Sequence, residues 1–353
     1  MDSDDDDLPT VQRAAVIQNP GPNATIAIRN NMPVGTPGPH EILVRISATG
    51  VCGSETRAFR GWGVYDPIVG HEGIGRVVKL GAGVSEDMLG RKVGVKWLYR
   101  ACGSCSVCLR GHRNNCPKQL NTGKHRPGTL QQYVVADARY VTEIPDGLHD
   151  AEVAPLLCAG LTMMGAVSKL KGDLSPGDWV VIQGAAGGLG HLGVQIAAKL
   201  RGYRVIAVDG SGHDQFCKDM GAEAFIDYTR DDVEKEVMKL TGEGAHAVIV
   251  VPESEDAYRI APKLARSMGT IVCVGLPHND FQIPIPVSLC ALKALNIKGA
   301  MVGTEREMEE LLKEAAAGRI RASIDYFHIS QTSEIISQLI NGEVFGRAVI
   351  TTL

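Results

Sequence analysis

A glycine-rich turn constrains the fold of this chain more than any other stretch of its sequence. It follows an apolar run at 179–183, opens a helical pattern at 189–201, and reads Gly184-Ala-Ala-Gly187-Gly188-Leu189-Gly190. Between a strand and a helix, such glycines let the backbone approach a pyrophosphate at the amino end of the helix. The same residues also fit an ordinary turn, so the surrounding elements must decide.

Apolar runs alternate with helical patterns from about residue 175 onward. Besides 179–183, the runs lie at 203–208, 224–227, 246–251, 269–274 and 295–299. Helical spacing separates most of them. Such βα repetition predicts an α/β fold with a mostly parallel, doubly wound sheet.

Asp209 follows the second of these runs, nineteen residues after Gly190. A carboxylate there can accept both ribose hydroxyls of an adenosine and repels a 2′-phosphate, which favours NAD over NADP. An ordinary Asp in a βα loop is the alternative, but strand, turn, helix, strand and Asp occur here in order. We therefore predict a dinucleotide site at the turn and Asp209, and add Gly275, which follows the run at 269–274.

The first 160 residues have a different texture, with short apolar runs broken by Gly and Pro, as at 42–46, 73–79 and 92–97. This texture is typical of an all-β region. A charged helix expected at 304–317 leads back into short β-like runs. We expect a catalytic domain from 11–160 and 304–353, a cofactor domain at 161–303, and a disordered acidic tail at 1–10.

The composition favours small-molecule chemistry in a soluble protein. The 353 residues carry 36 basic and 40 acidic side chains with no basic run, so no partner is expected among nucleic acids or anionic membranes. No window reaches about 18 uninterrupted apolar residues, and the amino terminus does not read as a signal or transit peptide. We therefore expect a cytoplasmic protein whose cysteines are reduced.

Four of the nine cysteines crowd into fifteen residues: Cys102, Cys105, Cys108 and Cys116. Their spacing suits a closed tetrahedral zinc site with no open coordination position. Such a zinc would be structural, because it would hold a loop that has few apolar residues to bury. The alternative is a set of unrelated free cysteines.

A second set of metal-ligand residues is dispersed along the chain. Cys52, His71 and Cys158 offer two thiolates and an imidazole, which would leave one zinc position open for an alcohol or carbonyl oxygen. Spacing alone cannot show that they meet, because a lone His is commonly a turn residue and a lone Cys a core residue. The other histidines, such as His191, are expected to be ordinary surface or loop residues.

Together these motifs resemble the zinc-containing medium-chain alcohol dehydrogenases, especially the fungal ethanol-dehydrogenase branch. The resemblance runs from about residue 11 to 350 and includes the segments at 94–98, 128–133, 154–160, 184–190 and 346–347. It implies a GroES-like, mostly β catalytic domain and a Rossmann cofactor domain. It also implies NAD(H), two zinc ions per chain, and a homodimer or homotetramer.

The resemblance assigns roles to individual residues. Those matching Cys52, His71 and Cys158 bind catalytic zinc, with Glu72 as an alternative ligand, and the four clustered cysteines bind structural zinc. Around the catalytic zinc, Glu55 is the partner of the ligand His and Ser54 bonds the substrate alcohol. The remaining assignments are Trp97 in the substrate pocket, Thr162 against the nicotinamide and Arg347 near the cofactor pyrophosphate.

Two positions depart from the branch. Gly53 stands where a charged residue usually meets the pyrophosphate, and Arg57 stands where a His often relays the proton to solvent. Arg cannot act as a base near neutral pH. We therefore hypothesise that Arg57 replaces the missing pyrophosphate charge and that water completes the proton relay.

The expected activity is hydride transfer between NAD(H) and a primary or secondary alcohol, aldehyde or ketone. The loop at 61–70 is shorter than in the branch, so a specialised biosynthetic reductase of a larger carbonyl is one alternative. A catalytically impaired, dehydrogenase-like zinc protein is another, because relay and cofactor positions have changed. A zinc-free quinone or enoyl reductase would lack both cysteine sets.

Overall fold

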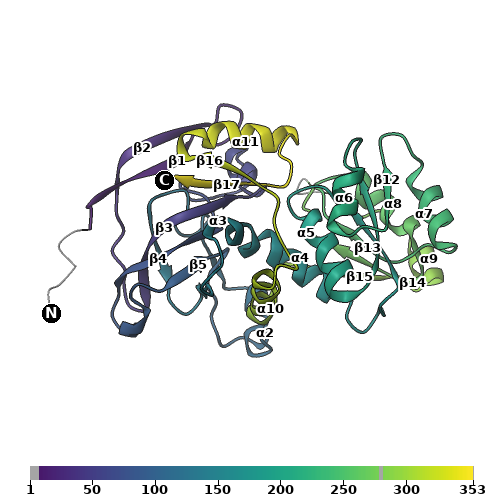
Figure 1. Ribbon diagram of the computed structural model, residues 1–353, viewed down its shortest axis with the longest axis horizontal. Coiled ribbons are helices and arrows are strands. Elements are labelled where there is room, and N and C mark those ends of the chain that lie inside the picture. The colour runs from purple at the N-terminus through teal and green to yellow at the C-terminus, as the bar shows by residue number, and fades with distance from the viewer. Residues whose placement is uncertain (1–7, 278–280, 353) are drawn as a thin grey trace. The chain divides into compact units, whose positions relative to one another are not determined.

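The computed structural model describes residues 8–277 and 281–352, which form two compact units. The first unit extends to Cys158 and includes Thr304–Ala316 and Ala322–Leu353, whereas the second comprises Ala159–Gly303 and Ala317–Arg321. Figure 1 colours both units along the chain. The expectation for the acidic tail falls mainly on residues 1–7, which lie outside the described residues.

A seven-stranded sheet forms the centre of the first unit. Its order is β16-β17-β3-β4-β5-β9, and β8 also pairs with β3. All pairings are antiparallel except β16 with β17. The strands are β3 (Glu41–Val51), β4 (Gly73–Leu80), β5 (Lys92–Val95), β8 (Tyr133–Asp137), β9 (Thr142–Glu143), β16 (Ile324–His328) and β17 (Arg347–Thr352).

Segments from both ends of the chain build this unit. The C-terminal strand β17 pairs with β3, which places them side by side in Figure 1. Two smaller sheets pair β1 (Val11–Gln18) with β2 (Thr25–Pro33), and β6 (Leu98–Arg100) with β7 (Leu120–Asn121). The helices are α1 (Glu55–Phe59), α2 (Ser106–Leu109), α3 (Asp150–Val153), α10 (Glu305–Ala316) and α11 (Thr332–Asn341).

A six-stranded parallel sheet forms the centre of the second unit, which confirms the predicted doubly wound fold. Its order is β12-β11-β10-β13-β14-β15. The strands are β10 (Trp179–Gln183), β11 (Arg204–Asp209), β12 (Ala224–Asp227), β13 (Ala245–Val250), β14 (Ala265–Cys273) and β15 (Asn296–Gly299). The helices are α4 (Ala159–Ser168), α5 (Gly190–Gln195) with a π turn at Ile196–Leu200, α6 (Asp214–Met220), α7 (Val233–Thr241), α8 (Glu255–Leu264) and α9 (Val287–Lys293).

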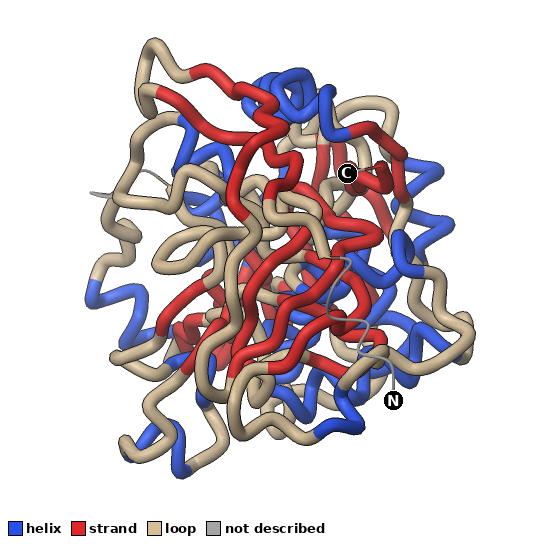
Figure 2. The backbone as a smooth tube through the Cα atoms, turned by 90° about the vertical axis from the view of Figure 1, so that its left-hand side faces the viewer, coloured by secondary structure: helices blue, strands red, loops and turns tan. Residues whose placement is uncertain are grey.

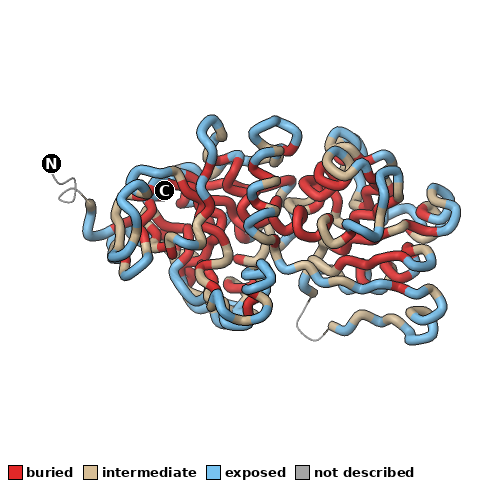
Figure 3. The backbone as a smooth tube through the Cα atoms, turned by 90° about the horizontal axis from the view of Figure 1, so that it is seen from below, coloured by how far each residue is buried: buried red, intermediate tan, exposed pale blue. Residues whose placement is uncertain are grey.

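Burial follows the sheets. Strands are red in Figure 2, and in Figure 3 buried residues are red and exposed residues pale blue. Strands β10 and β13 are almost wholly buried, as expected for central parallel strands covered on both faces.

No single helix among the described residues is long and apolar enough to cross a membrane. One bent pair, Asp150–Leu157 with Ala159–Ser168, meets that test by length and composition only.

Candidate metal and cofactor sites

Four buried side chains from distant positions meet in the first unit. The donor atoms of Cys52, His71, Glu72 and Cys158 all lie within 4.8 Å of one another. The Cys158 thiol is 3.9 Å from the Cys52 sulfur and 3.1 Å from Nε2 of His71. The dispersed residues of the sequence therefore form one cluster.

Strand pairing explains this convergence. Strands β3 and β4 pair antiparallel with Thr49 opposite Gly73, so the end of β3 lies beside the start of β4. Cys52 directly follows the residues of β3, and His71 and Glu72 directly precede β4. Cys158 directly follows a buried 3-10 turn at Ala154–Leu157.

The donor set fits a zinc ion with an open position. Two thiols and an imidazole are the ligands of a catalytic Cys₂His zinc site. The hydrogen bond with Cys158 lowers the pKa of the Cys52 thiol well below its usual value, against the effect of burial. That bond and burial raise the pKa of Cys158, and a bound metal would displace the thiol protons. The buried Oε2 of Glu72 has no hydrogen-bond partner among the described residues, as expected beside a cation site.

Glu55 holds the imidazole of His71 in orientation. Its Oε1 lies 2.8 Å from Nδ1 of His71, and its Oε2 accepts the backbone N–H of Cys52 at 2.7 Å. Burial alone would lower the pKa of His71, but the Glu55 charge and neighbouring hydrogen bonds raise it well above its usual value. A proton on Nδ1, donated to Glu55, leaves the Nε2 lone pair for a metal.

Glu72 forms a buried ion pair with Arg347. Their side chains are 0% and 3% exposed, and the guanidinium contacts Oε1 of Glu72. Burial raises the pKa of Glu72 to about 7, although the Arg347 charge opposes the rise. A Cβ at Gly50 would lie 2.0 Å from Oε2 of Glu72, so a larger residue there would displace the Glu72 carboxylate. The resemblance assigned Arg347 to the cofactor pyrophosphate, but in this structure it contacts Glu72.

The residues assigned to substrate border this cluster. The Trp97 ring packs edge-on against the His71 ring, with centroids 5.1 Å apart. Ser54 caps the amino end of α1, and neither its Oγ nor Nε1 of Trp97 has a hydrogen-bond partner within the described residues. Arg57, on α1, is buried and lies 5.7 Å from the ring centroid of Trp62. The unpartnered Ser54 hydroxyl and Trp97 indole N–H suit a site that binds a polar ligand.

The four clustered cysteines also converge. Their sulfurs lie within 4.8 Å of one another, with Cys102 3.6 Å from Cys116 and 4.0 Å from Cys108. A zinc tetrahedron with bonds of about 2.3 Å has sulfur–sulfur edges of about 3.8 Å. Hydrogen bonds from the backbone of Ser104 and Cys105 lower the pKa of Cys102 to about 6, whereas burial raises that of Cys108 to about 12. The geometry fits a closed four-thiolate zinc site.

The glycine-rich turn lies in the second unit, between β10 and α5. Gly184 has a φ of +70°, in the left-handed region that favours glycine. A Cβ at Gly190 would lie 2.0 Å from the Gly184 carbonyl oxygen. The tight turn therefore requires both residues, and it contains Gly187, Gly188 and Leu189.

Asp209 ends β11 and is tied to this turn. Its Oδ2 accepts the N–H of Ala186 at 2.7 Å, and its Oδ1 accepts that of Gly210 at 2.7 Å. Nδ1 of His213 lies 2.9 Å from the same Oδ1. A lone His in a loop gave no sequence signal for this contact. The structure thus brings the predicted turn and carboxylate together.

Two other assigned residues lie in the second unit. Thr162 is buried on α4, and a Cβ at Gly275 would lie 2.3 Å from the Pro252 carbonyl oxygen.

His191 corrects an expectation, because it is not a surface residue. It is fully buried on α5, with Nδ1 2.9 Å from the Gly187 carbonyl oxygen, so it supports the turn.

Sequence comparisons support this description. Residues 38–146 match the alcohol dehydrogenase GroES-like domain family, and residues 188–317 match the zinc-binding dehydrogenase family. The chain is 40% identical to alcohol dehydrogenase 2 of Emericella nidulans, over 98% of each protein. It is also 40% identical to an alcohol dehydrogenase of Geobacillus stearothermophilus, over 88% of this chain and 91% of that protein.

Solved structures share the fold across nearly the whole chain. Acetophenone reductase from Geotrichum candidum, solved in complex with NAD, has a TM-score of 0.84 at 26% identity and covers 98% of both chains. The alcohol dehydrogenase of Aeropyrum pernix has a TM-score of 0.87 at 27% identity, covering 96% of this chain and 99% of its own.

Proposed function

The chain belongs to the zinc-containing medium-chain alcohol dehydrogenase family and is a zinc alcohol dehydrogenase or carbonyl reductase; on this premise we propose that it interconverts alcohols with aldehydes or ketones by using NAD(H). The observation that carries the proposal is the convergence of Cys52, His71 and Cys158, with Glu55 bonded to the far nitrogen of the imidazole. Its chemistry suits a metal site with room for one exogenous oxygen ligand.

Cys52, His71 and Cys158 would hold the zinc, which would supply Lewis-acid chemistry to polarise a carbonyl oxygen or acidify an alcohol. The protein's own groups then position substrate and proton. The unpartnered Ser54 hydroxyl can bond the substrate oxygen and pass its proton onward, while the Trp97 ring limits space beside His71. Glu72, paired with Arg347, is available as a further carboxylate ligand.

NAD(H) is the proposed cofactor because of the turn and Asp209. A carboxylate at the end of β11 suits ribose hydroxyls and disfavours a 2′-phosphate. The acetophenone reductase of Geotrichum candidum, whose structure holds NAD, supports this choice by similarity. Asp209→Gly is expected to raise KM for NADH and to reduce the preference of the enzyme for NADH over NADPH. An unchanged ratio of the two kcat/KM values would contradict the role of Asp209.

Arg57 is proposed to meet the pyrophosphate charge, with water completing proton release. Arginine stays protonated across the working range of pH, so the relay adds no titration near pH 7. Replacing Arg57 with Ala should weaken NADH binding, as measured by the cofactor's fluorescence. Unchanged affinity would remove this role from Arg57.

A homodimer or homotetramer formed through the second unit is also part of the proposal. Strand β15 is at the edge of the parallel sheet, and it and α9 carry exposed apolar side chains. Val287 and Leu292 are 84% and 86% exposed, and Ile297 on β15 is 47% exposed. Such edges and patches favour association. Light scattering tests this surface by comparing the molar mass of the Ile297→Lys variant in solution with that of wild type.

The cytoplasm is the proposed location, because all nine cysteines are free thiols and both clusters need reduced sulfur.

Function itself is tested by zinc content together with NADH oxidation over carbonyls from acetaldehyde to acetophenone. Turnover of small aldehydes supports an ethanol-dehydrogenase-like enzyme. Turnover of bulky carbonyls alone supports a specialised reductase, and metal binding without any turnover contradicts the proposal.

A further inference from the structure

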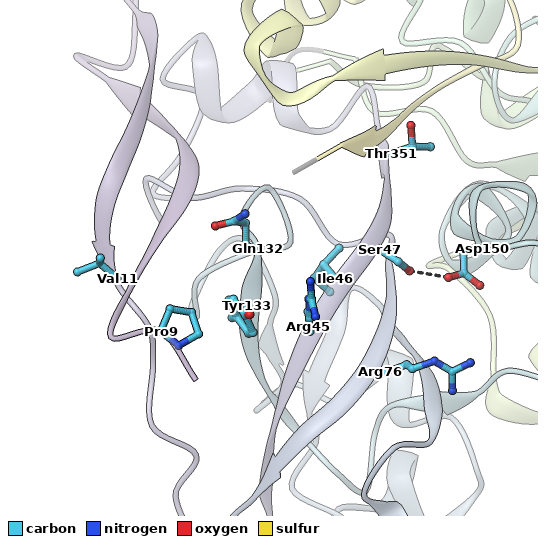
Figure 4. A pocket seen from close by; sticks show the side chains of 10 residues that line it. All are labelled: Pro9, Val11, Arg45, Ile46, Ser47, Arg76, Gln132, Tyr133, Asp150 and Thr351. Atoms are coloured by element: carbon cyan, nitrogen blue, oxygen red, sulfur yellow. Dashed lines mark hydrogen bonds between the residues drawn. The ribbon is translucent and has the colours of Figure 1, made fainter. Parts of the chain in front are cut away.

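We propose that a cationic pocket on the sheet of the first unit binds an organic phosphate monoester. The pocket is lined by side chains from β3, β4 and β8 and by residues near both ends of the chain (Figure 4). None of its lining residues belongs to the zinc or dinucleotide sites described above. The proposal therefore does not depend on the proposed function.

Strand register places like charges opposite one another in this pocket. Arg45 on β3 pairs with Arg76 on β4, and Arg76 pairs in turn with Lys92 on β5. On its other side Arg45 pairs with Tyr133 on β8. Directly opposed residues in antiparallel strands share a face with Cα atoms about 5 Å apart, and like charges there destabilise the sheet. A bound dianion would relieve this repulsion.

Of these three cations, only Lys92 is paired with a carboxylate among the described residues. Nζ of Lys92 lies 3.1 Å from Asp150, which also accepts the Ser47 hydroxyl at 2.6 Å. Among the described residues Arg45 has no hydrogen-bond or ion-pair partner, and Arg76 donates only to the Gly90 carbonyl at 3.0 Å. In the part of the chain that the structure describes, neither guanidinium is therefore paired with a carboxylate.

The rest of the pocket suits an organic group attached to the anion. Its volume is about 560 Å³, which lies within the usual range of small-molecule sites. Val11, Pro9 and Ile46 give it apolar lining, and Figure 4 shows Tyr133 next to Arg45. The Tyr133 hydroxyl has no partner among the described residues and can donate to a further oxygen. Two cations and a hydroxyl donor match the dianion and three oxygens of a phosphate better than a carboxylate.

Phenyl phosphate is the probe that tests this site. It is titrated calorimetrically into the full chain at low ionic strength with saturating NADH, so that any cofactor phosphate site is filled. Arg45→Gln and Arg76→Gln are each expected to weaken binding by about 10-fold or more, because each removes a charged hydrogen-bond donor. The matched control is Arg29→Gln, an exposed arginine on β2, which should leave the Kd unchanged.

Three further outcomes bear on the assignment. Benzoate and phenol should bind at least about 10-fold more weakly than phenyl phosphate, and equal binding of benzoate would overturn the choice of phosphate. Equal Kd values for wild type and both pocket variants would overturn the site itself. A chain beginning at residue 8, which lacks the acidic side chains of Asp2 and Asp4–Asp7, is tested in parallel. It should bind at least as tightly as the full chain, and loss of binding would overturn the role of the arginines.

Discussion

The two cysteine-containing clusters of the first unit use similar ligands in opposite ways. Cys102, Cys105, Cys108 and Cys116 lie within fifteen residues, and two of them are only partly buried. Cys52, His71 and Cys158 span more than one hundred residues and are all buried. The first cluster is held by its own loop, whereas the second exists only because strands β3 and β4 bring distant residues together.

This difference separates what a metal does for each region. The loop has a small apolar core built largely from its cysteines and Ala101, so we expect its order to depend on a bound metal. The buried cluster stands on a paired sheet that has its own core, including Ile42, Val44 and Val134. Metal should therefore determine stability at the loop and chemistry at the buried cluster.

The largest expected effect is on turnover at the buried cluster. Cys52→Ser should lower kcat/KM by about 10³-fold, because a Lewis acid contributes several kcal/mol to the transition state. Its melting temperature should stay close to that of wild type. Steady-state kinetics and calorimetry check both, with Cys273→Ser as the matched control. Retention of wild-type kcat/KM in Cys52→Ser would contradict the catalytic assignment.

Replacing a loop cysteine should reverse this pattern. Cys105→Ser is expected to destabilise the first unit by roughly 3–5 kcal/mol, because the metal orders the loop. At low temperature the folded fraction should keep kcat/KM within about threefold of wild type, since this closed site has no open position for substrate. A Cys105→Ser protein that melts like wild type would show that the loop needs no metal.

Glu55 should have an intermediate effect through His71. Its two oxygens serve the imidazole and the Cys52 N–H, but glutamine offers only one acceptor oxygen. Glu55→Gln should weaken zinc affinity by about 10- to 100-fold. Competition with a chelator measures this loss, and Glu55→Asp should recover part of it. Equal losses in the two variants would indicate a packing defect instead.

The smallest effect concerns Asp137, which anchors the strand leading into the loop. It pairs with Arg139 at 2.7 Å and also binds Arg100 on β6. Burial acts to raise the pKa of Asp137, but hydrogen bonds from the arginines outweigh it and leave the pKa below its usual value. The ion pairs of Asp137 therefore stabilise the fold fully at pH values above the pKa that this carboxyl has in the unfolded chain. This stabilisation is lost as the pH falls through the pKa of Asp137 in the folded protein.

Asp137→Asn should therefore cost about 1–2 kcal/mol at pH 7. This difference should persist to about pH 5 and shrink below about pH 4, where the unfolded carboxyl takes up a proton. Urea unfolding across this range checks the prediction, with the exposed Asp146→Asn as the control. A penalty that is independent of pH would show that the ion pairs do not cause it.

The sequence predicted elements whose signals are local. The turn at Gly184–Gly190, the parallel strands and the spacing of the loop cysteines follow from short-range patterns. Helix α11 was missed, because its stretch was expected between β-like runs, and its buried face depends on packing by Ile335 and Ile336. His191 was also missed, since its burial depends on contact between α5 and the turn.

In the candidate sites too, local sequence patterns did not predict contacts between residues far apart in the chain. Spacing alone indicated the loop cluster, but only the resemblance joined Cys52, His71 and Cys158 before the structure placed them together. The pairing of Arg347 with Glu72 connects residues 275 positions apart, so no local pattern could predict it. Contacts at such sequence separation are fixed by strand register and not by composition.

Zinc content per chain, measured together with activity and melting temperature in wild type, Cys52→Ser and Cys105→Ser, tests the central claim most directly. The two clusters predict two zinc ions in wild type and one in each variant. Cys52→Ser should lose activity and keep its stability, whereas Cys105→Ser should lose stability and keep activity at low temperature. One zinc in wild type, or the same property lost in both variants, would contradict the separation of a catalytic from a structural metal.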